Sequence, residues 1–286
     1  MFGHSTSKLR GKIVWITGAS SGIGEALAYE LAANGVKLAI SGTNVSRLEE
    51  VKRNCISLNQ LKEEDVLILS FNVKDYSQHQ KQFNSVITHF KTLDILVSNA
   101  GKGQRAEFAN IDIDVDKEMF EINVFGLINL SRIALRYFLQ NNIKGHLVVT
   151  SSIAGKSGAP NSSSYSATKH ALHGYFESAR IETKSKGISV TMLCPGPVVS
   201  RIAENSMGAV NCVLPIYLII VNIIGLISAA QELLCLQILY AILITLSPLF
   251  LLCIVPWIIV FGIVNRWGPV PRPGQPSHVV VVHHNV

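Results

Sequence analysis

The chain has 286 residues, of which 48% are hydrophobic and only 15% are charged, a more apolar balance than soluble globular domains show. Its net charge of +6 comes from scattered lysines and arginines, without a basic stripe interleaved with aromatic residues, so the sequence argues against a nucleic-acid-binding protein. The apolar excess is uneven, because Glu232 is the only charged residue between Glu204 and Arg266. We therefore predict a polar N-terminal segment (1–10), a globular domain (11–206), a hydrophobic membrane-associated region (207–266) and a proline-rich tail (267–286).

Apolar, β-branched runs alternate with stretches of helical spacing through the predicted globular domain. Runs such as KIVWIT are typical of buried parallel strands. In chain order we expect strand Lys12–Thr17, helix Ile23–Asn34 with Gly35 as its C-terminal cap, strand Val36–Ser41, helix Ser46–Leu61, strand Asp65–Phe71, helix Gln78–Phe90, strand Leu93–Ser98, helix 115–139, strand His146–Ser152, helix Ser163–Lys184 and strand Ile188–Leu193. This alternation predicts right-handed βαβ units, and therefore an α/β fold with a doubly wound parallel sheet (Rossmann fold).

The cysteines and histidines give no sign of a disulfide framework or a metal centre. The five cysteines contain no CxxC pair, and the nine histidines contain no HExxH motif. His170 and His173 are three residues apart on a predicted helix, but no further ligands lie nearby in the sequence. The last three cysteines (Cys212, Cys235 and Cys253) fall inside apolar sequence, so we expect them to be small buried hydrophobes in a reducing compartment, and we expect no metal site.

The first predicted strand leads directly into the glycine-rich turn TGASSGIG, and a helix follows. Glycines in this position allow a tight turn and a close approach of the backbone to a pyrophosphate, while the helix N-terminus offers free N–H groups to the phosphates. Glycines that serve only the chain reversal are the alternative, but the position between strand and helix favours cofactor binding. The candidate cofactor-binding residues of this turn are Gly18, Ser20, Ser21, Gly22, Ile23 and Gly24.

Three polar side chains point to proton-transfer chemistry. Tyr165 and Lys169 are four residues apart on a predicted helix and therefore share one face. A nearby ammonium favours the phenolate and lowers the pKa of a tyrosine, which makes it usable as a general acid and base. Such pairs also occur by chance on many helices. Ser152 favours the functional interpretation, because it lies at the carboxyl end of the fifth predicted strand, where ligands bind in open α/β sheets.

Taken together, these motifs resemble the short-chain dehydrogenase/reductase family over about residues 10–206. Thirteen positions separate Ser152 from Tyr165, as in that family. Three further runs, Arg47–Cys55, Cys194–Ser200 and Glu204-Asn205-Ser206, are similar to the membrane-associated branch around dehydrogenase/reductase member seven and the 11β-hydroxysteroid dehydrogenases. The motifs that carry the resemblance are TGASSGIG, Ser98-Asn99-Ala100-Gly101, Asn123, Ser152, Tyr165-Ser-Ala-Thr-Lys169 and Pro195-Gly196-Pro197-Val198.

The resemblance implies a role for each of these residues. Tyr165 would give a proton to the carbonyl oxygen of the substrate or take it back, and Ser152 would orient that oxygen. Lys169 would lower the pKa of Tyr165 and hold the nicotinamide ribose, and Asn123 would hold a water that connects Lys169 to solvent. The cofactor contacts implied by the family are Asn99, Ala100, Gly101, Tyr165, Lys169, Pro195, Gly196, Val198 and Ser200. The family also implies a homodimer through the 115–139 and 163–184 helices, and the branch implies a lipophilic substrate such as a steroid, retinoid or lipid-like carbonyl.

The residues after the second predicted strand favour NADP(H) over NAD(H). An acidic residue there would accept the ribose 2′-hydroxyl of NAD, whereas an arginine would pair with the 2′-phosphate of NADP. This chain has neither, but the hydroxyl and amide of Thr43 and Asn44 tolerate a phosphate better than a carboxylate would, and Arg47 lies one turn further on. Asn72 stands where the family usually has an aspartate near the adenine, and its carbonyl oxygen can still accept the amino hydrogen bond.

After Met207 the sequence departs from the loop, helix pair and last strand that the family would supply. Two apolar stretches, 213–230 and 238–264, are long enough to cross a hydrocarbon core of ~30 Å. A buried helix pair is the alternative, but a domain of this size rarely contains two all-round apolar helices of that length. We expect contact with membrane lipid.

Positive residues flank the two apolar stretches. Arg201 precedes the first, and Arg266 and Arg272 follow the second, so a hairpin with both ends cytosolic satisfies the positive-inside rule. We expect the membrane to be that of the endoplasmic reticulum, with the catalytic domain in the cytosol. A hairpin inserted in one leaflet is the alternative. The cytosolic topology predicts no glycan at the sequons that begin at Asn44, Asn129 and Asn161.

Three functions remain open from the sequence. The leading hypothesis is a membrane-anchored oxidoreductase that interconverts a carbonyl and an alcohol on a lipophilic substrate. The second is a non-catalytic nucleotide-binding scaffold or sensor, which the departure after Met207 motivates and the intact Ser152, Tyr165 and Lys169 oppose. The third is an atypical or mis-spliced C-terminus, in which case the domain folds poorly.

Overall fold

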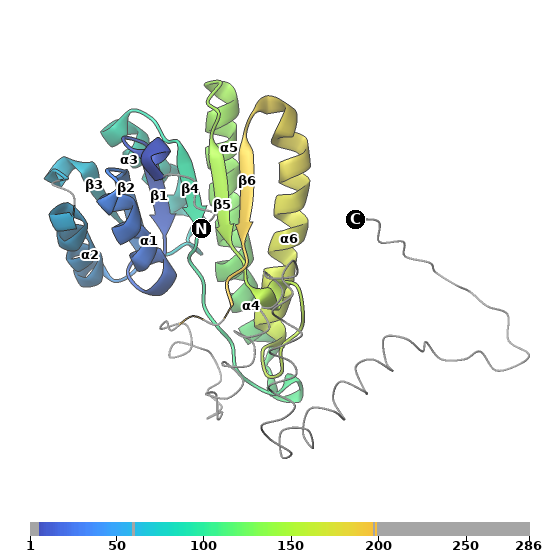
Figure 1. The fold of residues 1–286 in the computed structure, drawn as a ribbon. Coiled ribbons are helices and arrows are strands. Elements are labelled where there is room, and N and C mark those ends of the chain that lie inside the picture. Colours follow the sequence, from blue (N-terminus) through green and yellow to red (C-terminus); the bar gives the residue numbers. More distant parts are fainter. Residues whose placement is uncertain (1–5, 59–60, 197, 199–286) are drawn as a thin grey trace, which may run out of the picture. The chain divides into compact units, whose positions relative to one another are not determined.

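The structure, a computed structural model, describes residues 6–58, 61–196 and 198. Six parallel strands form one sheet in the order β3-β2-β1-β4-β5-β6 (Figure 1). The strand order reverses between β1 and β4, and such a switch point opens a crevice at the carboxyl edge of the sheet. The strands are β1 (Ile13–Thr17), β2 (Lys37–Gly42), β3 (Val66–Ser70), β4 (Ile95–Ser98), β5 (His146–Thr150) and β6 (Ser189–Leu193).

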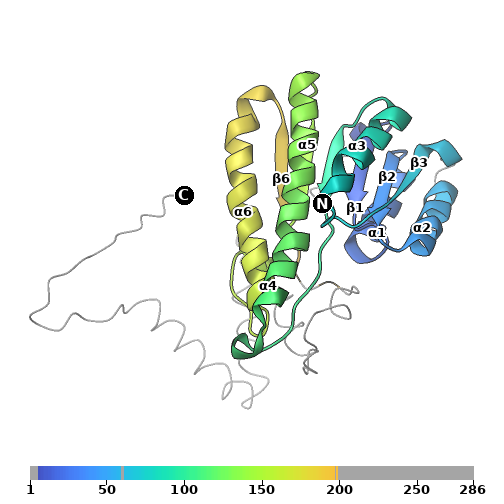
Figure 2. The same cartoon turned by 180° about the vertical axis from the view of Figure 1, so that it is seen from behind.

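Helices cover both faces of this sheet, which confirms the predicted doubly wound α/β fold. Figure 2 shows α3, α5 and α6 in front of the strands, whereas α1 and α2 pack on the opposite face. The helices are α1 (Gly22–Ala33), α2 (Val45–Leu58), α3 (Tyr76–Phe90), α4 (Ile113–Phe120), α5 (Gly126–Gln140) and α6 (Ser163–Thr183), with short turns at Thr6–Leu9, Glu63–Asp65, Phe108–Asn110, Ile153–Gly155 and Lys184–Lys186.

The central strand β1 shows why the strands are apolar on both faces. Ile13 and Trp15 belong to the core cluster that includes side chains of α3, α5 and α6. Val14 and Ile16 point the other way and pack with side chains of α1 and α2. Successive strand side chains alternate between faces, so a strand covered on both sides has no position left for a polar residue facing water.

The ends of the helices follow from local hydrogen bonds. Gly35 has a φ of +74°, and the N–H groups of Gly35 and Val36 donate to the carbonyls of Ala32 and Leu31. This left-handed cap ends α1 where the sequence predicts. Helix α3 begins two residues before its predicted start, because the side chain of Asp75 accepts a hydrogen bond from the Ser77 N–H at 3.2 Å.

The long helix expected at 115–139 is interrupted. It starts at Ile113 as α4, continues as one π-helical segment at Glu121–Phe125, and resumes as α5. Gly126 allows this packing, because a Cβ there would collide with the carbonyl oxygen of Val73. The π segment buries Asn123 completely. Segments of this kind are frequent at functional sites.

The same stretch, Ile113–Gln140, is the one part of the described chain long and apolar enough to cross a membrane. In its most apolar window 61% is buried inside the fold, and side chains such as Leu127 and Phe138 belong to the core. Packing against the sheet therefore explains its composition. The membrane stretches predicted at 213–230 and 238–264 lie outside the described residues, as does the proposed domain boundary at residue 206.

Candidate active site

The glycine-rich turn after β1 is shaped by close backbone contacts. Gly18 and Gly22 have φ angles of +66° and +61°, which residues with a side chain rarely adopt. A Cβ on Gly18 would lie 2.7 Å from the Cα of Ala100, and a Cβ on Gly24 would lie 2.6 Å from the side-chain nitrogen of Asn99. The turn therefore lies directly against the segment that follows β4.

Hydrogen bonds join these two segments. The amide of Asn99 donates to the carbonyls of Thr17 and Gly18 at 3.0 and 3.3 Å, and the N–H groups of Asn99 and Ala100 both donate to the hydroxyl of Thr17. Asn99 thus fixes the turn from the neighbouring strand, at the switch point of the sheet.

The start of α1 is suited to a pyrophosphate. Ser21 precedes the helix in an extended conformation, and its side chain makes no capping hydrogen bond within the described residues. The first N–H groups of α1 and the positive end of its dipole therefore remain available to an anion. The turn and the helix start fit the diphosphate of a dinucleotide, since small residues here let the backbone approach it.

Ser152, Tyr165 and Lys169 come together at the carboxyl edge of the sheet. Ser152 follows β5, and its hydroxyl accepts a hydrogen bond from the Ala154 N–H at 3.1 Å. Ser152 lies close enough to the Tyr165 hydroxyl to lower its pKa. The Lys169 ammonium lies 5.6 Å from the centre of the Tyr165 ring and donates to the Thr150 carbonyl at 2.8 Å. The predicted proximity of the three side chains is therefore present.

Burial dominates the protonation of this group. Burial raises the pKa of Tyr165 above its ordinary value, and the hydrogen bond with Ser152 and the positive charge of Arg105 only partly oppose this. Burial also lowers the pKa of Lys169 to about 8. The upward direction for Tyr165 corrects the sequence-based expectation of a lowered pKa. The sequence shows the neighbouring ammonium, but it does not show how far the phenol is removed from water.

Asn123 is held in place on both sides of its amide. Its oxygen accepts from the Lys102 N–H at 2.8 Å, and its nitrogen donates to the Lys102 carbonyl at 2.9 Å and to the Thr168 hydroxyl at 3.2 Å. These bonds join the π segment, the loop after β4 and the helix that carries Lys169. Gly101 lies between the two polar groups, since a Cβ there would be 3.1 Å from the Asn123 oxygen and 3.8 Å from the Lys169 nitrogen.

The residues after β2 and β3 have the exposure expected of a nucleotide-binding rim, but some of their polar atoms are engaged. The side-chain oxygen of Asn44 accepts from the Arg47 N–H at 3.1 Å and from the Ser46 hydroxyl, while Thr43 is exposed. The side-chain oxygen of Asn72 accepts from the Lys74 N–H at 3.1 Å. The side-chain oxygen of Asn44 therefore already accepts two hydrogen bonds within the protein, and that of Asn72 accepts one.

The segment after β6 is described only in part. The Pro195 carbonyl accepts from the Ile153 N–H at 3.1 Å, which extends the pairing of β5 and β6 beyond Ser152. Gly196 follows it, and Val198 is exposed. Pro197 and the predicted cofactor contact Ser200 lie outside the described residues.

Two residues of the site carry no signal in the sequence. Arg105 comes from the loop between β4 and α4, and its charge acts on Tyr165. That loop is tied to the segment before α6, since the Ala106 N–H donates to the Asn161 carbonyl at 3.1 Å. Thr150 contributes only a backbone carbonyl to Lys169. Pairings between distant loops, and backbone acceptors, can be found only from the fold.

The described residues thus define a doubly wound α/β domain with a phosphate-binding type of turn at its switch point and a Ser–Tyr–Lys group beside it. Residues 12–210 match the family described as short chain dehydrogenase. The chain belongs to the short-chain dehydrogenase family, as its motifs indicate.

Similar proteins place it in the expected branch. It is 41% identical over 201 residues to human "Dehydrogenase/reductase SDR family member 7", and 39% identical over 200 residues to "11-beta-hydroxysteroid dehydrogenase 1A" of Arabidopsis thaliana. Each alignment covers 70% of this chain, and they cover 59% and 56% of those relatives. The chain therefore matches less than two thirds of the length of these curated relatives.

Solved structures agree with the fold. A short-chain dehydrogenase/reductase from Burkholderia phymatum, solved in complex with NAD, aligns with a TM-score of 0.65 and 27% identity. The alignment covers 73% of this chain and 72% of that one. The architecture described above is therefore shared with a protein that binds a nicotinamide dinucleotide.

We expect Lys169→Met to stabilise the folded protein. At pH 7 the Lys169 ammonium is charged although it is buried, which lowers the free energy of unfolding by roughly 1–3 kcal/mol. An uncharged methionine at this position avoids that loss. Stability of the wild type should also rise between pH 8 and pH 10.5, because there the unfolded chain holds a proton that the folded protein has released. Thermal unfolding across this pH range measures both effects, with Lys144→Met on the surface as the control. A lower melting temperature with an unchanged pH dependence would contradict this account.

Proposed function

We propose that this protein is a membrane-anchored, NADP(H)-dependent oxidoreductase that interconverts a carbonyl and an alcohol on a lipophilic substrate. The observation that carries the proposal is the grouping of Ser152, Tyr165 and Lys169 at the carboxyl edge of the sheet, with the Lys169 ammonium 5.6 Å from the centre of the phenol ring. The nicotinamide cofactor supplies or accepts the hydride. The protein binds and orients the reactants and moves the proton.

Each residue of the group has a definite task in this proposal. Tyr165 donates its hydroxyl proton to the substrate carbonyl oxygen in reduction and accepts it in oxidation, while Ser152 donates a hydrogen bond to the same oxygen. The Lys169 ammonium stabilises the phenolate left behind. Asn123, whose amide bonds Lys102 and Thr168, holds the water that connects Lys169 to solvent in this proposal, as the family implies.

The cofactor is held between the turn after β1 and the segments after β2, β4 and β6. The α1 N-terminus takes the diphosphate, and Thr43, Asn44 and Arg47 face the adenosine ribose in this proposal. No acidic residue stands between Ser41 and Arg47, so a 2′-phosphate meets hydroxyl, amide and guanidinium groups rather than a carboxylate. This favours NADP(H).

Exposed apolar side chains at the carboxyl edge of the sheet, which carries Ser152, support a lipophilic substrate. Phe108, Ile113 and Ile153 are 83%, 64% and 37% exposed, and they follow β4 and β5 at the edge that carries Ser152. The composition of 207–266 supports a membrane anchor close to such substrates. Exposed Phe125, Tyr175 and Ile181 on the two long helical stretches are consistent with a homodimer formed there.

A second candidate is a binding protein that retains the dinucleotide site but does not turn over substrate. The family match ends at residue 210, and the chain that follows is unlike the usual substrate-covering region. The intact Ser152, Tyr165 and Lys169 speak against it, because function depends on the site rather than on the fold.

Turnover decides between these two functions. The full-length protein in detergent should oxidise NADPH with at least one member of a panel of retinal, a steroid ketone and an aliphatic ketone. Tyr165→Phe should reduce kcat by about 10²–10⁴-fold, because it removes the proton donor, while NADPH binding persists. Tyr175→Phe, on the exposed side of the same helix, is the control and should keep its activity. Equal rates for Tyr165→Phe and wild type would reject the assignment, and binding without turnover throughout the panel would favour the second candidate.

The cofactor preference can be measured without a substrate. Quenching of protein fluorescence should give a lower Kd for NADPH than for NADH. Arg47→Ala should weaken NADPH binding by about tenfold and leave NADH binding nearly unchanged, because only NADPH carries the 2′-phosphate. Arg53→Ala, an exposed arginine later on α2, is the matched control. Tighter NADH binding, or an equal loss for both dinucleotides, would overturn the preference.

The cytosolic topology predicts that endoglycosidase treatment leaves the mass of the native protein unchanged. Asn129 cannot test this, because its amide contacts His79 at 3.0 Å and the Ser131 of its sequon is 5% exposed. Asn44 is exposed, so it is the informative sequon. A mass shift that disappears in Asn44→Gln would place the domain on the luminal side.

A further inference from the structure

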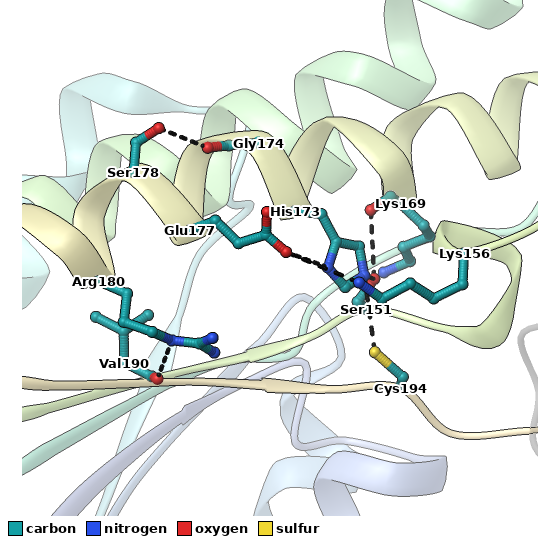
Figure 3. Close-up of polar contacts among 10 residues, drawn as sticks. All are labelled: Ser151, Lys156, Lys169, His173, Gly174, Glu177, Ser178, Arg180, Val190 and Cys194. Carbon is teal, nitrogen blue, oxygen red and sulfur yellow. Dashed lines mark hydrogen bonds and ion pairs between the residues drawn. The ribbon is translucent and has the colours of Figure 1, made fainter. Parts of the chain in front are cut away.

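His173 links three elements directly behind the catalytic group. It lies one turn after Lys169 on α6 and is 8% exposed (Figure 3). Its Nε2 is 3.0 Å from the Ser151 hydroxyl at the end of β5 and 3.7 Å from the Cys194 sulfur after β6. Its Nδ1 is 3.6 Å from a carboxylate oxygen of Glu177, one turn further along α6.

The order of hydroxyl, imidazole and carboxylate is the one that activates a nucleophile in hydrolases. Here it cannot do so, because Ser151 is 1% exposed and a substrate cannot reach its hydroxyl. The arrangement must therefore act within the protein. Ser151 directly precedes Ser152, so whatever fixes Ser151 also fixes the serine of the site.

Ser151 is held from three directions. Its N–H donates to the Leu193 carbonyl at 2.7 Å, and its hydroxyl lies 3.3 Å from the Lys169 carbonyl as well as against His173. There is no free space beside it, since a Cβ on Gly155 would lie 2.6 Å from the Ser151 oxygen and 2.9 Å from the Lys169 oxygen. The end of β5 is thus in close contact with the Lys169–His173 turn of α6.

The surrounding charges determine which ring nitrogen carries the proton. The Glu177 carboxylate faces Nδ1 and favours a proton there, so Nε2 keeps its lone pair. The Ser151 hydroxyl has one hydrogen, which goes to Nε2 at 3.0 Å in preference to the Lys169 carbonyl at 3.3 Å. The other titratable groups facing the ring are Lys156, which also approaches Glu177 at 3.8 Å, His170, Cys194 and Lys169. Burial, followed by the charge of Lys156, lowers the pKa of His173, which keeps the ring a neutral acceptor at neutral pH.

We propose that His173 is a positioning residue: by accepting the hydrogen bond of Ser151 it fixes the end of β5 against α6 and so places Ser152 opposite Tyr165. This inference rests on the proposed oxidoreductase function. Its first readout does not need turnover, because the hydrogen bond with Ser152 lowers the pKa of Tyr165 and a displaced Ser152 must let it rise.

His146 provides a matched control. It also joins β5 and β6, since its Nε2 lies 2.8 Å from the Thr191 hydroxyl, and burial lowers its pKa as well. It lies at the opposite end of β5, away from Ser152. A purely structural histidine between these strands should therefore behave like His146.

The experiment follows the tyrosinate absorbance of the full-length protein in detergent as the pH is raised. Each variant is compared with the same variant that also carries Tyr165→Phe, and the difference between the two curves is the titration of Tyr165. His173→Leu should raise the midpoint by about one pH unit and lower kcat about tenfold, with KM for NADPH changed less than about twofold. His173→Gln, whose amide can still bond Ser151, should restore both values towards the wild type. Ser151→Ala should match His173→Leu, and the double variant should be no worse than either. His146→Leu should lower the melting temperature only.

An unchanged midpoint in His173→Leu, an equal shift in His146→Leu, or a failure of His173→Gln to restore the midpoint would overturn the proposal. If His173→Leu does not fold, Ser151→Ala decides alone, and an unchanged midpoint there overturns it too. If the wild type reduces no carbonyl of the panel, the oxidoreductase function fails, while the titration still decides the role of His173.

Discussion

The buried ammonium of Lys169 is the constraint to which the rest of the site responds. It is 2% exposed, and the hydrogen bond that it makes within the described residues goes to the backbone carbonyl of Thr150. A charge in this position is tolerated only where the surrounding polar groups are held rigidly. The end of β5 supplies that rigidity through Thr150, Ser151 and Ser152 in succession. Thr150 and Ser151 contact Lys169 and His173 of α6, and Ser152 lies close to Tyr165 of the same helix.

The same burial of ionisable side chains makes the site less stable than the core of the domain. A phenol removed from water and an ammonium removed from water both have protonation equilibria displaced against their charged forms. Neither would be selected for folding alone. Active sites commonly retain such residues because the cost is recovered in chemistry. The apolar core on both sides of the sheet provides the stability that makes this possible.

Much of this arrangement could be predicted from the sequence, for identifiable reasons. The strands were predictable because burial on both faces leaves runs such as IVWIT, and the cap at Gly35 because a positive φ favours glycine. The proximity of Tyr165 and Lys169 follows from helical spacing. The π segment was not predictable, because its apolar positions still fit an ordinary helix. The raised pKa of Tyr165 and the contribution of Arg105 depend on burial and on loop pairing, which no local pattern encodes.

The π segment at Glu121–Phe125 also limits how this chain can change length. A π turn corresponds to one residue more than a regular helix needs. Losing that residue would let α4 and α5 fuse into a straight helix, but everything on one side of the junction would turn by about 100° relative to the other. Asn123 would leave the interior, and α5 would present a different stripe to the sheet. Surface loops can absorb insertions and deletions, whereas at this point in the helix the number of residues is as constrained as their identity.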